Sequence, residues 1–282
     1  MSVLSCLREQ ACEPTRRTGR TLWRYPERNQ PLQALLLDSE TLLLAAATFL
    51  LAGFVKGVIG LGMPTISIAL LCLGMGLPTA LQIIVVPTLV TNIWQALVGH
   101  GLVRLVNRFA ALLVGIMAGV WLGYALLFRN YPMTMTAVLG AAIIVYAIGG
   151  ILRIPLMPRI ERERIASPIV GLATGVLAGA TGNLSMPALA YFDRLGMPRH
   201  DLVQMLGISF TLGTAAIGIA MAGHGDYQLP LLHVSALAVI PAVAGMLLGQ
   251  RARGRMSELA FRRALYAGLT LVGTHLIWKG LA

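Results

Sequence analysis

The sequence has few charged residues, and none of its carboxylates lies in the middle of a long apolar run. Only 12% of its 282 residues are charged, whereas 57% are hydrophobic; soluble domains carry about 25% charged residues. The eleven acidic residues lie in the first 40 positions, in the gaps between apolar runs or at their ends. Cation pumps and many proton-coupled carriers need a buried Asp or Glu to bind the cation or relay the proton. This distribution therefore argues against a cation carrier.

Cysteine and the common catalytic motifs are also scarce or missing. Cys6, Cys12 and Cys72 follow neither a disulfide nor a zinc-binding spacing. The sequence contains no His-Glu-x-x-His, no Gly-x-Ser-x-Gly and no pair of acids inside an apolar run. We therefore predict a protein that is not an enzyme and that has no metal site and no cofactor.

Positive charge is present in excess, with a formal net charge of +11 and a pI of about 10.4. In a soluble protein this balance would favour nucleic acid as a partner. Here the Arg residues occupy short gaps between apolar runs, where they fix membrane topology and meet anionic headgroups. We expect the lipid bilayer as the partner and no nucleic acid; a homo-oligomer is left open.

The first 38 residues differ from the rest of the chain. This segment contains six Arg and three Pro but no apolar stretch of signal-peptide length. We expect residues 1–38 to be a polar, solvated tail, although a misassigned start codon would explain the segment equally well.

The remaining sequence consists of apolar runs, most of them about 20 residues long, which is the length that a helix needs to cross a ~30 Å hydrocarbon layer. They occupy roughly 41–76, 79–99, 107–128, 133–152, 167–192, 200–222, 230–250 and 259–279. We predict an all-α, multi-pass protein of the cell membrane, the inner membrane in a bacterium.

A Gly-rich break interrupts two of these runs, and the second copy follows the first after about 118 residues. The breaks read Gly57-Val-Ile-Gly60-Leu-Gly62-Met-Pro64 and Gly175-Val-Leu-Ala-Gly179-Ala-Thr-Gly182-Asn183. Further downstream, Leu77-Pro78 matches Met197-Pro198, and Gly99-His100-Gly101 matches Gly223-His224-Gly225. We predict two repeated halves of about four membrane segments each, the first segment of each half being broken or re-entrant. The halves are 39–152 and 167–282, joined by a charged linker at 153–166.

The Arg residues of the loops test this topology. The 153–166 linker and the loops around 194–199 and 251–263 all contain Arg, and the positive-inside rule places them in the cytoplasm. All three loops are cytoplasmic only if segment 167–192 returns to the side that it enters from. If segment 41–76 does the same, the halves are inverted, and the Arg-rich tail lies outside, against the same rule.

Broken helices at membrane depth must be buried in protein or line a watery cavity, and paired breaks indicate a transporter's binding site. Helices that restart near Pro64 and Asn183 would offer unpaired N–H groups to an anion. Lys56 is the one charge candidate inside a run, and it either attracts the anion or extends to the interface. The polar residues near the breaks either bind substrate or join helices by hydrogen bonds. The predicted substrate-binding residues are Lys56, Gly60, Gly62, Asn92, Gln95, Gly179, Gly182, Asn183, Ser185 and Gln204.

The doubled motif resembles that of the TauE/SafE family of sulfite exporters over roughly residues 40–280. The matching positions are Gly57, Gly60 and Gly62 before Gly76-Leu77-Pro78, and Gly175, Gly179, Gly182 and Pro187 before Gly196-Met197-Pro198. Met63-Pro64 stands where two glycines are usual in the family. The resemblance implies passage of a small sulfur oxyanion or organosulfonate, often outward, without a nucleotide-binding domain.

Together these features predict a secondary transporter, an exporter of a small anion such as sulfite or an organosulfonate, that works by alternating access around the two breaks. The alternative is a passive anion channel or a membrane subunit of a larger complex.

Overall fold

The computed structural model describes residues 15–17, 20–22, 39–128, 130–152, 160, 162–252 and 258–281. The chain divides into two units, residues 1–38 and 39–282. In the first unit, β1 (Thr15–Arg17) and β2 (Arg20–Leu22) pair as antiparallel strands. Most of the predicted 1–38 tail and of the 153–166 linker lies outside the described residues.

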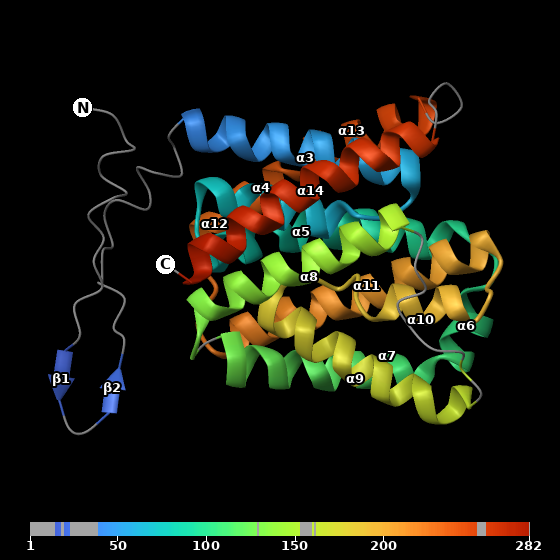
Figure 1. Cartoon of the computed structure of the whole chain (residues 1–282), viewed down its shortest axis with the longest axis horizontal. Helices are drawn as coiled ribbons and strands as arrows, with labels where there is room; N and C mark the ends of the chain where they lie inside the picture. Colours follow the sequence, from blue (N-terminus) through green and yellow to red (C-terminus); the bar gives the residue numbers. More distant parts are fainter. Residues whose placement is uncertain are drawn as a thin grey trace. The chain divides into compact units, whose positions relative to one another are not determined.

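The second unit is helical, as predicted (Figure 1). Its helices are α3 (Ser39–Ile59), α4 (Met63–Gly74), α5 (Leu77–Val98), α6 (Leu102–Arg108), α7 (Ala110–Leu122) with the π-helical extension η2 (Gly123–Phe128), α8 (Pro132–Leu152), α9 (Glu163–Thr181), α10 (Ala188–Arg194), α11 (Arg199–Gly223), α12 (Leu229–Leu237), α13 (Val239–Ala252) and α14 (Glu258–Leu281). Within the described part, six helical segments are long and apolar enough to cross a membrane. The chain is therefore a multi-pass membrane protein.

The chain reverses direction at both Gly-rich breaks. After the first break, α4 runs back along α3, so that a Cβ added to Gly74 would lie 2.5 Å from Cδ2 of Leu44. After the second break, the hydroxyl of Tyr191 in α10 lies 2.7 Å from that of Ser167 near the start of α9. Gly62 and Gly182 have φ angles of 99° and 76° at these reversals, a region that glycine enters without the steric cost of a Cβ.

Two seams of glycine join α3 to α13 and α7 to α9. A Cβ added to Gly57 would lie 2.2 Å from the backbone oxygen of Met246, and one added to Gly175 would lie 2.2 Å from that of Ile116. Contacts this short require glycine, as in other membrane helices that pack closely. Gly179, predicted to bind substrate, belongs to the α7–α9 seam, where its added Cβ would lie 2.2 Å from the oxygen of Val120. The structure thus places Gly179 in helix packing.

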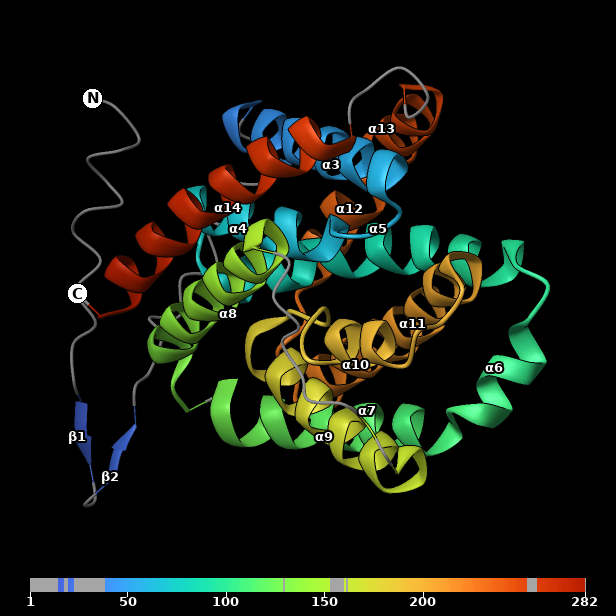
Figure 2. The same ribbon diagram turned by 45° about the vertical axis from the view of Figure 1, so that its right-hand side comes forward.

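The directions of the paired helices follow a regular scheme. In both seams, later residues of one helix contact later residues of the other. Helix α3 is therefore parallel to α13, and α7 is parallel to α9. The α5–α11 pair is antiparallel, because Gly207 lies against Ala96 while Gly218 lies against Val85. The α8–α14 pair is antiparallel too, because Gly273 lies against Ile144 while Gly280 lies against Ala137. Figure 2 shows α3 beside α13, and α7 beside α9, in the turned view.

The α7–α9 seam yields a stability prediction. Gly119→Ala would place a Cβ 2.3 Å from the oxygen of Leu172, so the two backbones must move apart. We expect a loss of about 1–3 kcal/mol, the usual cost of overpacking, visible as a lower thermal unfolding temperature in detergent. The matched control is Gly268→Ala, where the added Cβ meets nothing within 4 Å. Equal unfolding temperatures for the two variants would contradict the close packing of α7 against α9 at Gly119.

Candidate functional site

Lys56 lies in the last turn of α3, and its side chain is buried, with 4% of the residue exposed. Its ammonium Nζ donates hydrogen bonds to Oγ1 of Thr91, at 3.2 Å, and to Oδ1 of Asn92, both on α5. The lysine therefore points into the protein and does not extend to a membrane interface. Within the described part of the chain, the buried charged residues are Lys56 and Asp201.

The two Gly-rich breaks meet each other at Thr65, in the first turn of α4. The Thr65 hydroxyl donates to Oδ1 of Asn183 at 3.2 Å and lies 2.8 Å from the hydroxyl of Ser185. Thr65 and Asn183 are 118 positions apart, which is also the spacing between the two copies of the break. Equivalent positions of the two copies are thus in direct contact.

The first turn of α4 links this contact to Lys56. Sδ of Met63 lies 3.3 Å from Oγ1 of Thr91, and the same Thr91 oxygen accepts a hydrogen bond from Lys56. Residues from α3, α4, α5 and the second break thereby form one buried group, which we call the polar cluster. Its members are Lys56, Thr65, Thr91, Asn92, Asn183 and Ser185.

The local conformation at the two breaks differs from the prediction in one respect. The α4 helix does restart at the first break, with Pro64 in its first turn and no side chain capping its N-terminus. The expected restart near Asn183 is wrong, because α10 begins only at Ala188. Oδ1 of Asn183 instead accepts the backbone N–H of Ser185 at 3.0 Å, a local turn that competes with helix formation.

Two side-chain amides of the polar cluster keep buried donors without a partner among the described residues. They are Nδ2 of Asn92 and Nδ2 of Asn183. In both residues the amide oxygen is already occupied, by Lys56 or by Thr65. An unpaired buried donor costs about 1–3 kcal/mol, so each such group calls for an explanation such as a missing ligand. Unpaired amide donors and an ammonium are groups that can bind an anion.

The polar cluster offers no ligand set for a metal. No group of three or more His, Cys, Asp or Glu side chains comes together anywhere in the described ranges. Its hydrogen-bonding capacity consists of hydroxyls, amides and one ammonium, and an ammonium repels cations.

Comparison with protein families identifies the chain. The family described as sulfite exporter TauE/SafE matches residues 45–276, which is most of the helical unit. The chain belongs to the TauE/SafE family. Its members are membrane transporters of sulfite and related anions, not enzymes. A comparison with curated proteins and one with solved structures gave no significant match.

Two further predicted site residues of this TauE/SafE protein lie outside the polar cluster. Nε2 of Gln95 donates to the backbone oxygen of Val203 at 2.6 Å. Gln204 accepts from the N–H of Gly101 at 3.0 Å and donates to the oxygen of Ala96 at 2.8 Å. These amides join α5 to α11 through hydrogen bonds to the backbone. Joining helices in this way was the alternative to substrate binding that the sequence left open.

Two members of the polar cluster, Thr65 and Thr91, are among the polar residues that the sequence offers as lining for a pathway, although the predicted binding set does not include them. Thr65 stands eight positions after Gly57, as Asn183 stands eight positions after Gly175. The repeat spacing was therefore a signal that could have identified Thr65. No comparable signal marks Thr91, whose contacts with Lys56 and Met63 depend on how α3, α4 and α5 pack.

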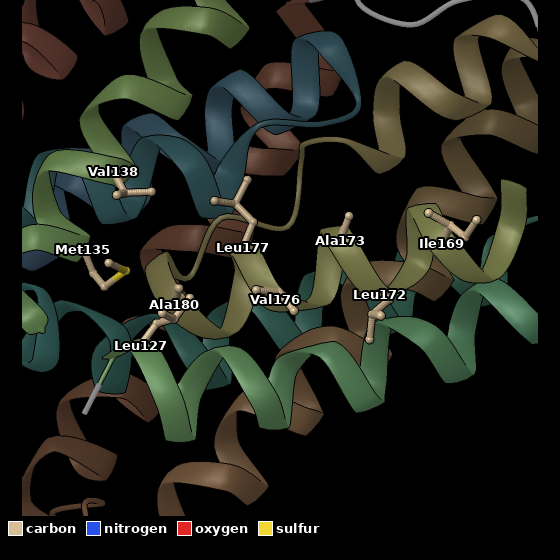
Figure 3. A pocket seen from close by; sticks show the side chains of 9 residues that line it. All are labelled: Leu127, Met135, Val138, Ile169, Leu172, Ala173, Val176, Leu177 and Ala180. Carbon is tan, nitrogen blue, oxygen red and sulfur yellow. The ribbon is translucent and has the colours of Figure 1, made fainter. Parts of the chain in front are cut away.

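An apolar cavity of about 500 Å³ lies between α8, α9 and η2 (Figure 3). Its lining consists of Leu127, Met135, Val138, Ile169, Leu172, Ala173, Val176, Leu177 and Ala180. A desolvated anion needs hydrogen-bond donors or a counter-charge, and none of these side chains supplies either. The polar cluster, which does contain such groups, is therefore the candidate anion site of this TauE/SafE protein.

An ion pair joins the two halves near the ends of their helices. Arg104 of α6 holds both carboxylate oxygens of Asp201 at 2.7 Å, and 9% of the Asp201 side chain is exposed against 65% for Arg104. Arg104→Gln would leave a largely buried carboxylate without its main partner, at a cost of about 1–3 kcal/mol.

We expect Arg104→Gln to lower the unfolding temperature. The control is Arg194→Gln, which changes an exposed Arg at the end of α10; its free energy of unfolding should stay within about 0.5 kcal/mol of wild type. The double variant Arg104→Gln/Asp201→Asn should regain part of the loss. Wild-type stability for Arg104→Gln alone would mean that the pair contributes nothing.

Proposed function

We propose that this TauE/SafE protein is a secondary transporter that exports a small anion, sulfite or an organosulfonate, by alternating access. The observation that carries the proposal is the buried Lys56, which has no carboxylate partner among the described residues and belongs to a cluster that keeps two unpaired amide donors. Burying an isolated charge is costly. A site that retains one without a counter-ion is expected to receive that counter-ion from a substrate.

Three members of the polar cluster contact the anion in this proposal. Lys56 supplies the charge that attracts the anion. Asn92 and Asn183 donate hydrogen bonds to its oxygens, and their occupied amide oxygens fix the direction in which the N–H groups point. The uncapped N-terminus of α4 adds the positive end of a helix dipole.

We further propose that the chain is built from two inverted repeats, each beginning with a re-entrant hairpin. The chain reversals after α3 and α9 support the hairpins. The parallel seams α3–α13 and α7–α9, with the antiparallel pairs α5–α11 and α8–α14, support a two-fold relation that exchanges the repeats. Inverted repeats around a central site are the usual basis of alternating access.

The orientation in the membrane follows from the Arg-bearing loops. Arg162 precedes α9, Arg194 ends α10 and Arg251 lies in the last turn of α13. If each hairpin returns to the side that it enters from, these residues share one face of the membrane, and the positive-inside rule makes it cytoplasmic. We propose the inner membrane of a bacterium, where the membrane potential contributes about 2.3 kcal/mol per exported negative charge per 100 mV.

Reconstitution into proteoliposomes tests this function. We expect uptake of labelled sulfite that saturates with concentration and that accelerates when unlabelled sulfite is present on the opposite side. Flux that stays linear and shows no such acceleration would indicate a channel. The absence of flux for sulfite and for simple sulfonates, with folded protein, would indicate a subunit that needs a partner, and would refute the proposal.

A further inference from the structure

We infer that the polar cluster selects anions by charge, and that it takes singly charged anions such as hydrogen sulfite or an alkanesulfonate in preference to dianions. This inference rests on the proposed function and adds a substrate class to it. It starts from the charges of the described residues. Lys56 is the one buried cation among them, and Asp201, the buried anion, already holds Arg104.

The first step concerns the protonation of Lys56. Both of its side-chain partners offer acceptors, Oγ1 of Thr91 and Oδ1 of Asn92. The Thr91 hydroxyl lies 2.9 Å from the backbone oxygen of Pro87, to which it donates, so it turns a lone pair toward the lysine. Lys56 therefore acts as a donor in both contacts, which a neutral amine and an ammonium can both do. An anion beside Nζ favours the ammonium, because an opposite charge nearby stabilises the charged form. With an anion bound, the ammonium has one N–H left for that ligand, and the polar cluster supplies one formal positive charge.

The second step compares two energies. The cost of removing an ion from water rises with the square of its charge, whereas its attraction to a single ammonium rises only in proportion to its charge. A dianion therefore loses four times the solvation of a monoanion of the same size and gains only twice the attraction. The neutral donors of Asn92 and Asn183 stabilise either ion, but they bring no second charge.

The third step concerns the shape of the donor set. The unpaired donors of the polar cluster are the Asn92 and Asn183 amides and the remaining N–H of the Lys56 ammonium. A sulfonate spreads one negative charge over three oxygens, so several neutral donors can share it. A second anionic group on the same molecule would find no second buried cation among the described residues. An uncharged polar group needs none.

Two sulfonates of the same carbon skeleton provide the test. Isethionate ends in a hydroxyl and carries one charge, while sulfoacetate ends in a carboxylate and carries two. In proteoliposomes we expect unlabelled isethionate to inhibit uptake of labelled isethionate at concentrations roughly tenfold lower than sulfoacetate needs, equivalent to about 1.4 kcal/mol. Equal inhibition by the two anions would overturn the inference and leave the proposed function standing.

Sulfite supplies a second arm, because its charge changes with pH. Uptake of sulfite should fall as the pH rises through the second pKa of sulfurous acid, where the monoanion becomes a dianion. Isethionate keeps its charge over this range, so its uptake reports any effect of pH on the protein itself. Sulfite uptake that follows isethionate uptake across the range would contradict charge selection. Absence of uptake for both anions would refute the proposed function, and the inference with it.

Discussion

Lys56→Met is expected to abolish anion transport while the protein still folds. Methionine is close to lysine in length and fills the space that the side chain occupies, but it removes the buried ammonium. Truncating one partner of a buried charge pair costs about 2–5 kcal/mol, so we expect transport efficiency to fall by roughly a hundredfold or more. The fold should tolerate the change, because the Thr91 hydroxyl keeps its bond to the oxygen of Pro87.

The measurement is initial-rate uptake into proteoliposomes at matched protein content. The control is Lys279→Met, the same substitution at the only other lysine of the chain. Nζ of Lys279 donates to the backbone oxygen of Cys72 at 3.0 Å, near the end of α4, and touches no member of the polar cluster. We expect this control to keep most of its flux. Wild-type flux in Lys56→Met would remove Lys56 from the mechanism.

Asn92→Asp is expected to block transport without loosening the structure. The substitution keeps the size of the side chain and the acceptor that Lys56 uses, but replaces the unpaired Nδ2 donor with a carboxylate oxygen. Lys56 then has an internal counter-ion, and an incoming anion must compete with it and approach a negative charge. We expect a loss of transport at least as large as for Lys56→Met, together with equal or higher thermal stability because the buried ammonium gains a partner.

Asn107→Asp provides the matched control, because it makes the same chemical change on the exposed surface of α6. Uptake and unfolding temperature are measured for both variants in parallel. Asn107→Asp should leave both near wild type. If Asn92→Asp transports at the wild-type rate, the anion does not bind beside Asn92, and the site must lie elsewhere.

The sequence was sufficient to predict the helices because apolar length and Gly-rich breaks act locally. The breaks after α3 and α9 appear where their glycines predicted them, and Pro78 lies in the first turn of α5. The run predicted at 230–250 instead divides into α12 and α13 at Ala238. Pro241 explains the division, because it cannot donate to the oxygen of Leu237 and its ring clashes there.

The candidate site was predictable only in part, because its contacts join distant segments. Lys56, Asn92, Asn183 and Ser185 do lie in one cluster. Gln95 was predicted to bind substrate and stands three positions after Asn92, on the same face of the helix, yet its amide bonds to α11. Periodicity gives the face of a helix but not the neighbour that covers it.

Direct localisation of a bound anion tests whether the polar cluster is the anion-binding site. Bromoethanesulfonate carries a single charge and a bromine atom, whose anomalous scattering marks its position in a crystal of the protein. The account predicts an anomalous peak beside the polar cluster, with the sulfonate oxygens at hydrogen-bond distance from Lys56 Nζ, Asn92 Nδ2 and Asn183 Nδ2. A peak only at the Arg-bearing loops or in the apolar cavity between α8 and α9, with the polar cluster unchanged, would contradict it.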